Sequence, residues 1–192
     1  MKTVILLTTV LSVAGLAGLS AAQTTPSAGS ARQKDQKDQK DAPAASSLAK
    51  QDMDFFEEAA QGGLMEVKLG QVAVRQAASE DVRKFGQRMI DDHTKANARL
   101  AEIGRDKKLV VPQELDKKHK DMVDKLTQNT GAKFDREYMS HMADDHQNDV
   151  KMFEKEAKDG KDADLKQFAA NTLPTLQEHL SLSKDLDTRL KK

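Results

Sequence analysis

The sequence predicts an all-α protein, a ferritin-like four-helix bundle with an extra short helix in the crossover between the second and third long helices. Four long segments between residues 52 and 190 carry apolar residues at i+3 and i+4 spacing. No segment alternates with a period of two, so strands are not expected. A longer connection containing Pro112 and Gly131 lies between the second and third long segments. One long crossover among short connections is typical of ferritin-like bundles.

Residues 1–22 have the pattern of a secretory signal peptide. Lys2 precedes an apolar stretch from Val4 to Leu19, and Ser20-Ala21-Ala22 offers the small residues that signal peptidase prefers. Cleavage is therefore expected after Ala22. An uncleaved membrane anchor is the alternative, and the short apolar run disfavours it. We expect an exported protein, in the periplasm or outer cell envelope, with no transmembrane span once the signal is removed.

Residues 23–50 are expected to form a disordered tether. The stretch holds Pro26, Pro43 and a threefold Gln-Lys-Asp repeat from Gln33 to Asp41, with few apolar residues. It is either a spacer that holds the domain off a surface or a leader with no role. The helical domain is expected to occupy residues 51–192.

The first helix is expected over about residues 52–78. Its apolar stripe is Phe56, Ala60, Gly63, Val67, Gly70 and Val74. Met65, Leu69 and Val72 lie on the other side, so this helix is expected to be buried broadly. Glycine lowers helix propensity, and close packing against another backbone would compensate for that cost.

The second helix is expected to begin after a capping Ser79 and to end near Lys108. Glu80 and Asp81 in its first turn favour the helix dipole. Its stripe is Val82, Phe85, Met89, His93, Ala96, Leu100 and Ile103.

The remaining helices are expected over residues 113–129, 134–158 and 162–190. The short one should end at Gly131, the next at Gly160, and Pro174 should kink the last one. Their stripes are Leu115, His119, Met122 and Leu126; Met139, Met142, His146, Val150, Phe153 and Ala157; and Leu165, Phe168, Ala169, Thr172, Leu176, His179, Ser183, Leu186 and Leu190.

An acidic residue directly precedes a histidine on three of the long helices. The pairs are Asp92-His93, Asp145-His146 and Glu178-His179. Each histidine lies on an apolar stripe near the middle of its helix, or somewhat past it for the third. Because the central turns of long helices share a layer in an up-down bundle, the three imidazoles are expected to meet, with Glu66 as a fourth member.

A site of three histidines and Glu66 would suit a transition-metal ion. Zn, Mn, Fe and Cu all accept such ligands, and ligand type alone does not choose among them. Asp92, Asp145 and Glu178 are expected to point along the helix flanks, where a carboxylate can accept the N–H of a neighbouring imidazole. The alternative is a metal-free core in which these residues form a structural polar network.

Several other functions are disfavoured. Charge is balanced at 31 basic and 31 acidic residues, so nucleic acid is not an expected partner. There is no cysteine, no serine in a nucleophile elbow and no Gly-rich phosphate loop. A di-iron oxidase needs Glu-x-x-His on two helices. The residues three before each histidine are instead Ile90, Ala143 and Leu176.

Methionine and the remaining histidines are assigned structural roles. Met89 and Met142 each precede a stripe histidine by four residues and so share its face, which is a weak signal for copper. Methionine at helical spacing more often fills a core. His119 is expected to be structural, and His141 lies off its helix's stripe and receives no role.

Phe55 to Leu190 resembles the bacterial exported helical-bundle family catalogued as domain of unknown function 4142. The blocks that carry the resemblance are Ala59-Ala60-Gln61-Gly62-Gly63-Leu64-Met65-Glu66-Val67, Met89-Ile90-Asp91-Asp92-His93-Thr94-Lys95-Ala96-Asn97, Phe134-Asp135-Arg136-Glu137-Tyr138-Met139, and Thr172-Leu173-Pro174-Thr175-Leu176 with His179. The resemblance implies a ferritin-like four-helix bundle in the periplasm or outer envelope, often labelled an outer-membrane protein. It implies no agreed activity.

Two hypotheses follow from the sequence. The first is a non-enzymatic exported bundle that binds a transition-metal ion. The second is a metal-free envelope stress or interaction protein that acts on an envelope surface or a protein partner. A metal-dependent oxidase is a weaker third hypothesis. Oligomeric state is left open by the sequence.

Overall fold

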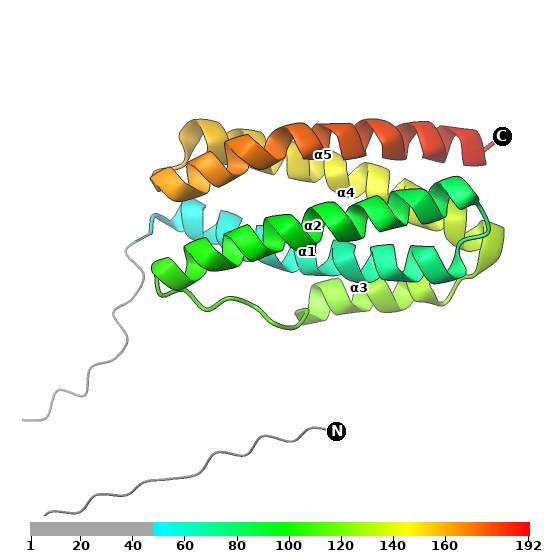
Figure 1. The fold of residues 1–192 in the computed structure, drawn as a ribbon, viewed down its shortest axis with the longest axis horizontal. Helices are drawn as coiled ribbons and strands as arrows, with labels where there is room; N and C mark the ends of the chain where they lie inside the picture. The colour runs from blue at the N-terminus through cyan, green and yellow to red at the C-terminus, as the bar shows by residue number, and fades with distance from the viewer. Residues whose placement is uncertain (1–47) are drawn as a thin grey trace, which may run out of the picture. The chain divides into compact units, whose positions relative to one another are not determined.

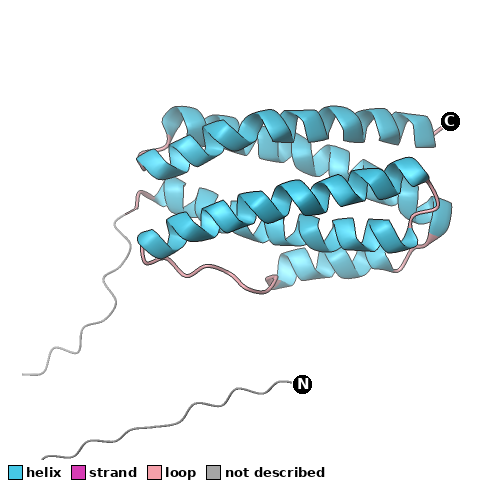
Figure 2. Ribbon diagram, viewed as in Figure 1, coloured by secondary structure: helices cyan, strands magenta, loops and turns pink. Residues whose placement is uncertain are grey.

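The structure, a computed structural model, describes residues 48–192 of the chain. The regular secondary structure of this part is entirely helical (Figures 1 and 2). Its five helices are α1 (Lys50–Gln76), α2 (Glu80–Asp106), α3 (Lys117–Thr127), α4 (Gly131–Asp159) and α5 (Ala163–Leu190). The all-α prediction is confirmed. The expected signal peptide, and the expected tether as far as residue 47, lie outside the described residues.

The long helices form two antiparallel hairpins joined by a crossover. α1 packs mainly against α2, and α4 packs mainly against α5. The crossover with α3 returns the chain along the bundle, so α4 starts at the same end as α2 (Figure 1). α3 itself lies against α1 and α4. This is the ferritin-like connectivity that the sequence predicts.

Two buried aspartates fix the ends of the bundle. Asp135, in the first turns of α4, accepts hydrogen bonds from the backbone N–H groups of Ala78 and Ser79 in the α1–α2 turn. Asp52, at the start of α1, does the same for residues 161 and 162 in the α4–α5 turn. Each hairpin therefore holds the turn of the other, because backbone donors in a buried turn need acceptors.

Two helix boundaries and one capping contact differ from expectation. α3 starts four residues late because the carboxylate of Asp116 caps it, accepting from the backbone N–H of His119 at 2.9 Å. Gly131 does not end the short helix; it is the first residue of α4, with φ of 59°. Ser79 occupies the N-cap position of α2, but its side chain makes no capping bond within the described residues. Asp135 accepts from the backbone N–H of Ser79 itself, which precedes the helix.

Gly70 of α1 lies against Gly86 of α2. A Cβ on Gly70 would lie 2.6 Å from the Gly86 carbonyl oxygen. The expected approach of another backbone is therefore found at Gly70. At Gly63 the neighbour is a side chain, since a Cβ there would lie 2.0 Å from Oδ1 of Asn97. α5 continues through Pro174, and the expected kink stays a prediction.

The core consists of two apolar clusters with a polar layer between them. One cluster lies towards the α1–α2 turn and includes Leu69, Val72, Phe85, Met89, Phe134, Tyr138, Met139, Met142 and Leu186. The other lies towards the α4–α5 turn and includes Phe55, Phe56, Leu100, Ile103, Phe153, Leu165, Phe168 and Leu176. Along α2, α4 and α5, the histidine of the middle layer separates members of the two clusters.

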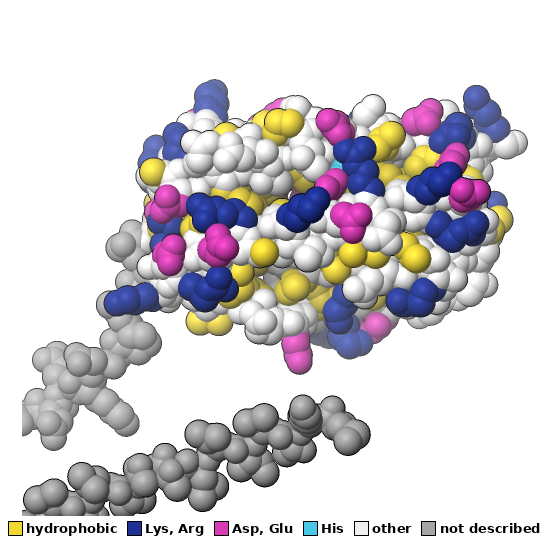
Figure 3. Space-filling model, in the orientation of Figure 1, with side chains coloured by type: hydrophobic (Ala, Val, Ile, Leu, Met, Phe, Trp, Pro, Cys, Tyr) yellow, Lys and Arg dark blue, Asp and Glu magenta, His cyan; other side chains and the backbone are white. Residues whose placement is uncertain are grey.

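Charged side chains of both signs are interspersed over the face shown in Figure 3, with apolar patches between them. Hardly any histidine surface is visible on that face. Among residues 48–192, no helix has the length and apolar character needed to cross a membrane. The expectation that nucleic acid is not a partner stays a prediction.

Candidate metal centre

Each of the four long helices contributes one polar side chain to the middle layer. Glu66 comes from α1, His93 from α2, His146 from α4 and His179 from α5. All four are buried: Glu66 is 2% exposed, and His146 and His179 are 0% exposed. The structure therefore brings together the four residues expected from the sequence to form a site.

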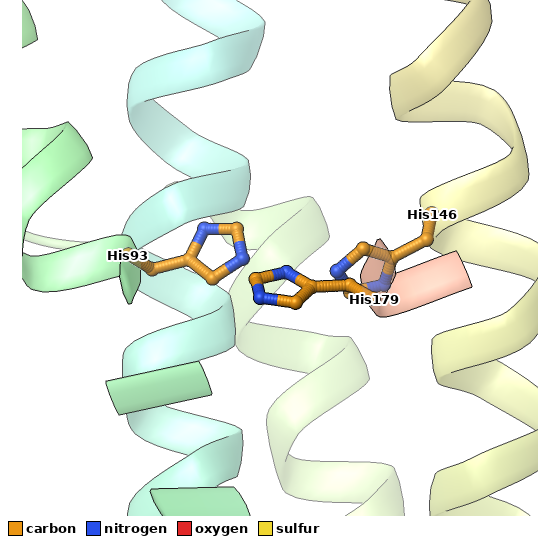
Figure 4. Close-up of side chains that lie close together, drawn as sticks. All are labelled: His93, His146 and His179. Carbon is orange, nitrogen blue, oxygen red and sulfur yellow. The ribbon is translucent and has the colours of Figure 1, made fainter. Parts of the chain in front are cut away.

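The three imidazoles face one another (Figure 4). Their ring centroids are 5.8 Å apart for His93 and His146, 5.4 Å for His93 and His179, and 5.2 Å for His146 and His179. One ring nitrogen of each lies within 4.8 Å of the other two. Tetrahedral bonds of about 2.1 Å place nitrogens roughly 3.4 Å apart, so a small inward rotation of the rings would complete the geometry.

One ring nitrogen of each imidazole contacts a carboxylate or carbonyl oxygen. His179 Nε2 lies 2.9 Å from Oδ2 of Asp92. His146 Nδ1 lies 2.9 Å from the carbonyl oxygen of Met142 and donates to it. His93 Nδ1 is 2.8 Å from Oε2 of Glu66. Such partners fix the tautomer and orientation of a metal-ligating histidine and make its other nitrogen more basic.

The second nitrogen of each ring has no hydrogen-bond partner within the described residues. These atoms are His93 Nε2, His146 Nε2 and His179 Nδ1, and Oε1 of Glu66 is unpartnered as well. Glu66 Oε1 is 3.2 Å from His146 Nε2, but the two are not aligned for a hydrogen bond. An unsatisfied buried polar group costs about 1–3 kcal/mol, so four in one layer require an explanation.

Burial keeps these imidazoles neutral. It lowers the pKa of His93 and of His179 to about 4. It lowers the pKa of His146 well below its ordinary value, and the neighbouring His93 and His179 add to the effect. A neutral imidazole offers a lone pair to a cation, so at pH 7 protons do not compete for these nitrogens.

Asp92 is the ionised partner of His179. Partial burial pushes the pKa of Asp92 upward, but hydrogen bonds from His179 and Arg88 hold it below its ordinary value. Nε of Arg88 lies 3.3 Å from Oδ2 of Asp92, and the same guanidinium pairs with Glu178. Glu178 thus acts on the site through Arg88 and Asp92; within the described residues it accepts no hydrogen bond from an imidazole.

Asp145 lies in an acidic group rather than behind an imidazole. Carboxylate oxygens of Glu66, Asp145 and Asp149 lie within 4.8 Å of one another. Burial, and then the charge of Asp145, raises the pKa of Glu66 well above its ordinary value. Glu66 is therefore shared between the three histidines and the acidic group.

The other histidines lie outside the centre. Nδ1 of His119 is 2.9 Å from Asp116, the residue that caps its own helix. His141 is partly buried on α4 and does not join the histidine cluster.

Sequence reasoning missed three contributors to the centre. The Met142 carbonyl is a backbone group and leaves no signal in residue type. Arg88 precedes Asp92 by four residues, and Asp149 follows Asp145 by four, so helical spacing held the information needed to find both.

Comparison with known proteins gives a family and a fold. Residues 21–186 match the family described as Domain of unknown function (DUF4142). No curated protein sequence matches the chain.

Three solved structures have a similar fold. A DUF305 fragment from Deinococcus radiodurans has a TM-score of 0.64 and 13% identity, covering 74% of this chain and 98% of its own. A DUF305 protein from Streptomyces coelicolor, described as secreted, has a TM-score of 0.61 and 14% identity over 73% and 94% of the two chains. CopM in its Cu(II)-bound form has a TM-score of 0.60 and 17% identity over 72% and 96%. Such low identities establish the fold alone.

Proposed function

Because this chain belongs to the DUF4142 family, a domain of unknown function, we propose its role from its own side chains: it is an exported protein that binds a transition-metal ion in the middle of a ferritin-like bundle. His93, His146 and His179 are the nitrogen ligands, and Glu66 is the oxygen ligand. The secretory pattern of residues 1–22, and the description of the Streptomyces coelicolor protein as secreted, support export.

One observation carries the metal proposal. Three buried imidazoles each use one nitrogen to contact a carboxylate or carbonyl and leave the other unpartnered in a shared layer. A structural polar network would pair these nitrogens with one another or with hydroxyl groups. A single cation would satisfy all of them and Glu66 Oε1 together.

The donor set fits a divalent ion of the Zn, Mn, Fe and Cu group. For sites built from nitrogen and oxygen, affinity in this series is highest for Cu(II). The Cu(II)-bound form of CopM, which shares the fold, supports including copper among the ions tested. A di-iron oxidase needs Glu-x-x-His pairs, and none occurs in residues 48–192. We therefore propose metal binding rather than oxidase chemistry.

The test is metal stoichiometry by elemental mass spectrometry, on the full chain purified without a histidine tag. After loading with Zn, Mn, Fe or Cu salts and desalting, the wild type should retain an ion that the His93→Ala/His146→Ala variant loses. His141→Gln removes an imidazole from α4 outside the cluster and should leave retention unchanged. If the folded wild type retains no ion, the metal-free interaction protein becomes the better hypothesis.

A further inference from the structure

A second group of ligands lies directly beside the histidines. It consists of Glu66, Asp145 and Asp149, whose carboxylate oxygens lie within 4.8 Å of one another. Within the described residues, no hydrogen bond or ion pair reaches the carboxylate of Asp145 or of Asp149, although much of the surface carries such pairs. Three mutually close carboxylates without a paired cationic side chain repel one another strongly in a partly buried place.

Glu66 is buried and has one carboxylate oxygen without a hydrogen-bond partner within the described residues, the same atom that the proposed histidine site uses. It is 2% exposed, and this unpartnered atom is Oε1. Its other oxygen, Oε2, lies 2.8 Å from the imidazole of His93. The same carboxylate thus belongs to both groups, as a carboxylate that bridges two ions would.

The structure also contains space at this point. A cavity of about 20 Å³ is lined by Glu66, Asp149 and His93 among others, so it adjoins two of the three acids but not Asp145. A volume of about 10–15 Å³ is enough for one water molecule, so the cavity is large enough for one small cation.

The two hairpins give Asp149 a position equivalent to that of Glu66. Asp52 on α1 and Asp135 on α4 make matching contacts to opposite turns. Glu66 and Asp149 are as far apart along the sequence as Asp52 and Asp135 are. Each hairpin therefore places one acid equally far from its own end of the bundle, and the two carboxylates lie within 4.8 Å of each other.

We propose that Glu66, Asp145 and Asp149 form a second cation site beside the three histidines, with Glu66 shared between two ions. Oxygen-only ligands suit a hard divalent cation such as Mn²⁺, Mg²⁺ or Ca²⁺, whereas the imidazoles suit Zn²⁺ or Cu²⁺. This inference rests on the proposed function, since Glu66 belongs to both sites. In the metal-free protein, burial raises the pKa of all three acids.

The test uses the full chain, first given one equivalent of Zn²⁺ and then titrated with Mn²⁺. Free Mn²⁺ is measured from its electron paramagnetic resonance signal, and bound Zn²⁺ by elemental analysis after desalting. We expect one Mn²⁺ to bind per chain. The Asp145→Asn/Asp149→Asn variant should bind it at least tenfold more weakly and keep its Zn²⁺.

Asp144→Asn, an exposed neighbour on α4, is the matched control and should bind Mn²⁺ like the wild type. The single variant Asp149→Asn guards against misfolding of the double variant and should also weaken Mn²⁺ binding. The second site would be overturned if both aspartate variants bound Mn²⁺ like the wild type, or if the wild type bound Zn²⁺ but no Mn²⁺. Neither result would contradict the proposed function. Failure of the histidine site to hold Zn²⁺, or Mn, Fe or Cu loaded in its place, would reject both.

Discussion

At the scale of single residues, the chemistry of the centre is set by what lies behind each imidazole. His179 contacts a carboxylate, His146 a carbonyl and His93 Glu66, and each imidazole keeps one nitrogen without a hydrogen-bond partner within the described residues. Sequence spacing could predict that these histidines meet, because each lies on an apolar stripe at a similar depth. It could not predict which nitrogen each would leave free, because that depends on backbone carbonyls and on side-chain rotamers.

The pH dependence of stability should report the buried imidazoles. His93 and His179 have a pKa of about 4 when folded and about 6.5 when unfolded, so the unfolded chain binds more protons between these values. Above about pH 6.5 these histidines contribute fully to the free energy of unfolding. As the pH falls towards 4, that free energy decreases by up to roughly 1.4 kcal/mol per pH unit for each histidine.

Urea unfolding of the metal-free chain at pH 7, 5.5 and 4.5 measures this slope. The raised pKa values of Glu66, Asp145 and Asp149 act in the opposite direction, so the informative quantity is the difference from a His93→Gln/His179→Gln variant. The wild type should lose more stability on acidification than the variant does. Equal slopes would mean that these imidazoles are accessible to protons in the folded state.

Asp92 should act as a positioning residue for metal binding. Asp92→Asn removes the charge that receives the His179 N–H, and loss of such a partner weakens metal affinity about 10–100-fold. Competition between the protein and a chelator for Zn²⁺ measures the affinity. Asp91→Asn changes the exposed preceding residue and should have little effect. Equal affinities for the two variants would show that Asp92 does not act through His179.

At the scale of elements, the helices follow from apolar periodicity, whereas their ends depend on tertiary contacts. The stripes predicted the four long helices to within a few residues. Ser79 lies at the N-cap position, as the sequence indicated, but its side chain makes no capping hydrogen bond within the described residues, and Asp135, distant in sequence, accepts from the N–H groups of the turn before the helix. Asp116 starts α3 later than apolar spacing indicated, because a local carboxylate cap outweighs weak periodicity in a short helix.

The glycines of α1 give a matched test of helix packing. Gly70→Ala places a Cβ 2.6 Å from the Gly86 carbonyl oxygen, so the helices must separate, at a cost of about 1–3 kcal/mol. A Cβ at Gly62 meets nothing within 4 Å, and alanine there should stabilise the helix by up to about 1 kcal/mol. Thermal unfolding of the two variants measures both changes in stability. If Gly70→Ala unfolds at the same temperature as Gly62→Ala, the described approach of α1 and α2 is wrong.

At the scale of the whole bundle, contacts at its ends and the polar layer at its centre set the arrangement of the two hairpins. Their reciprocal contacts through Asp52 and Asp135 could not be read from sequence, because an aspartate near a helix start also serves as an ordinary cap. The ferritin-like connectivity was predictable from one long crossover among short connections. These end contacts keep the four long helices at a register that brings Glu66 and the three histidines to one depth.

Asp52→Ala and Asp135→Ala should each destabilise the domain by about 2–5 kcal/mol, since each leaves two backbone N–H groups without an acceptor. The control is Asp54→Ala, an exposed aspartate on α1 paired only with Lys50, which should change stability by about 0.5 kcal/mol or less. Denaturant unfolding of the three variants measures these changes in stability. Losses as small as that of Asp54→Ala would contradict the role of these end contacts.

The central claim is that a metal ion binds between the four long helices through three imidazoles and Glu66. The most direct measurement is a crystal structure of the Zn²⁺-loaded chain with anomalous data collected at the zinc edge. The account predicts one anomalous peak about 2.0–2.1 Å from His93 Nε2, His146 Nε2 and His179 Nδ1. An empty layer between the same imidazoles, with zinc only on the protein surface, would contradict it.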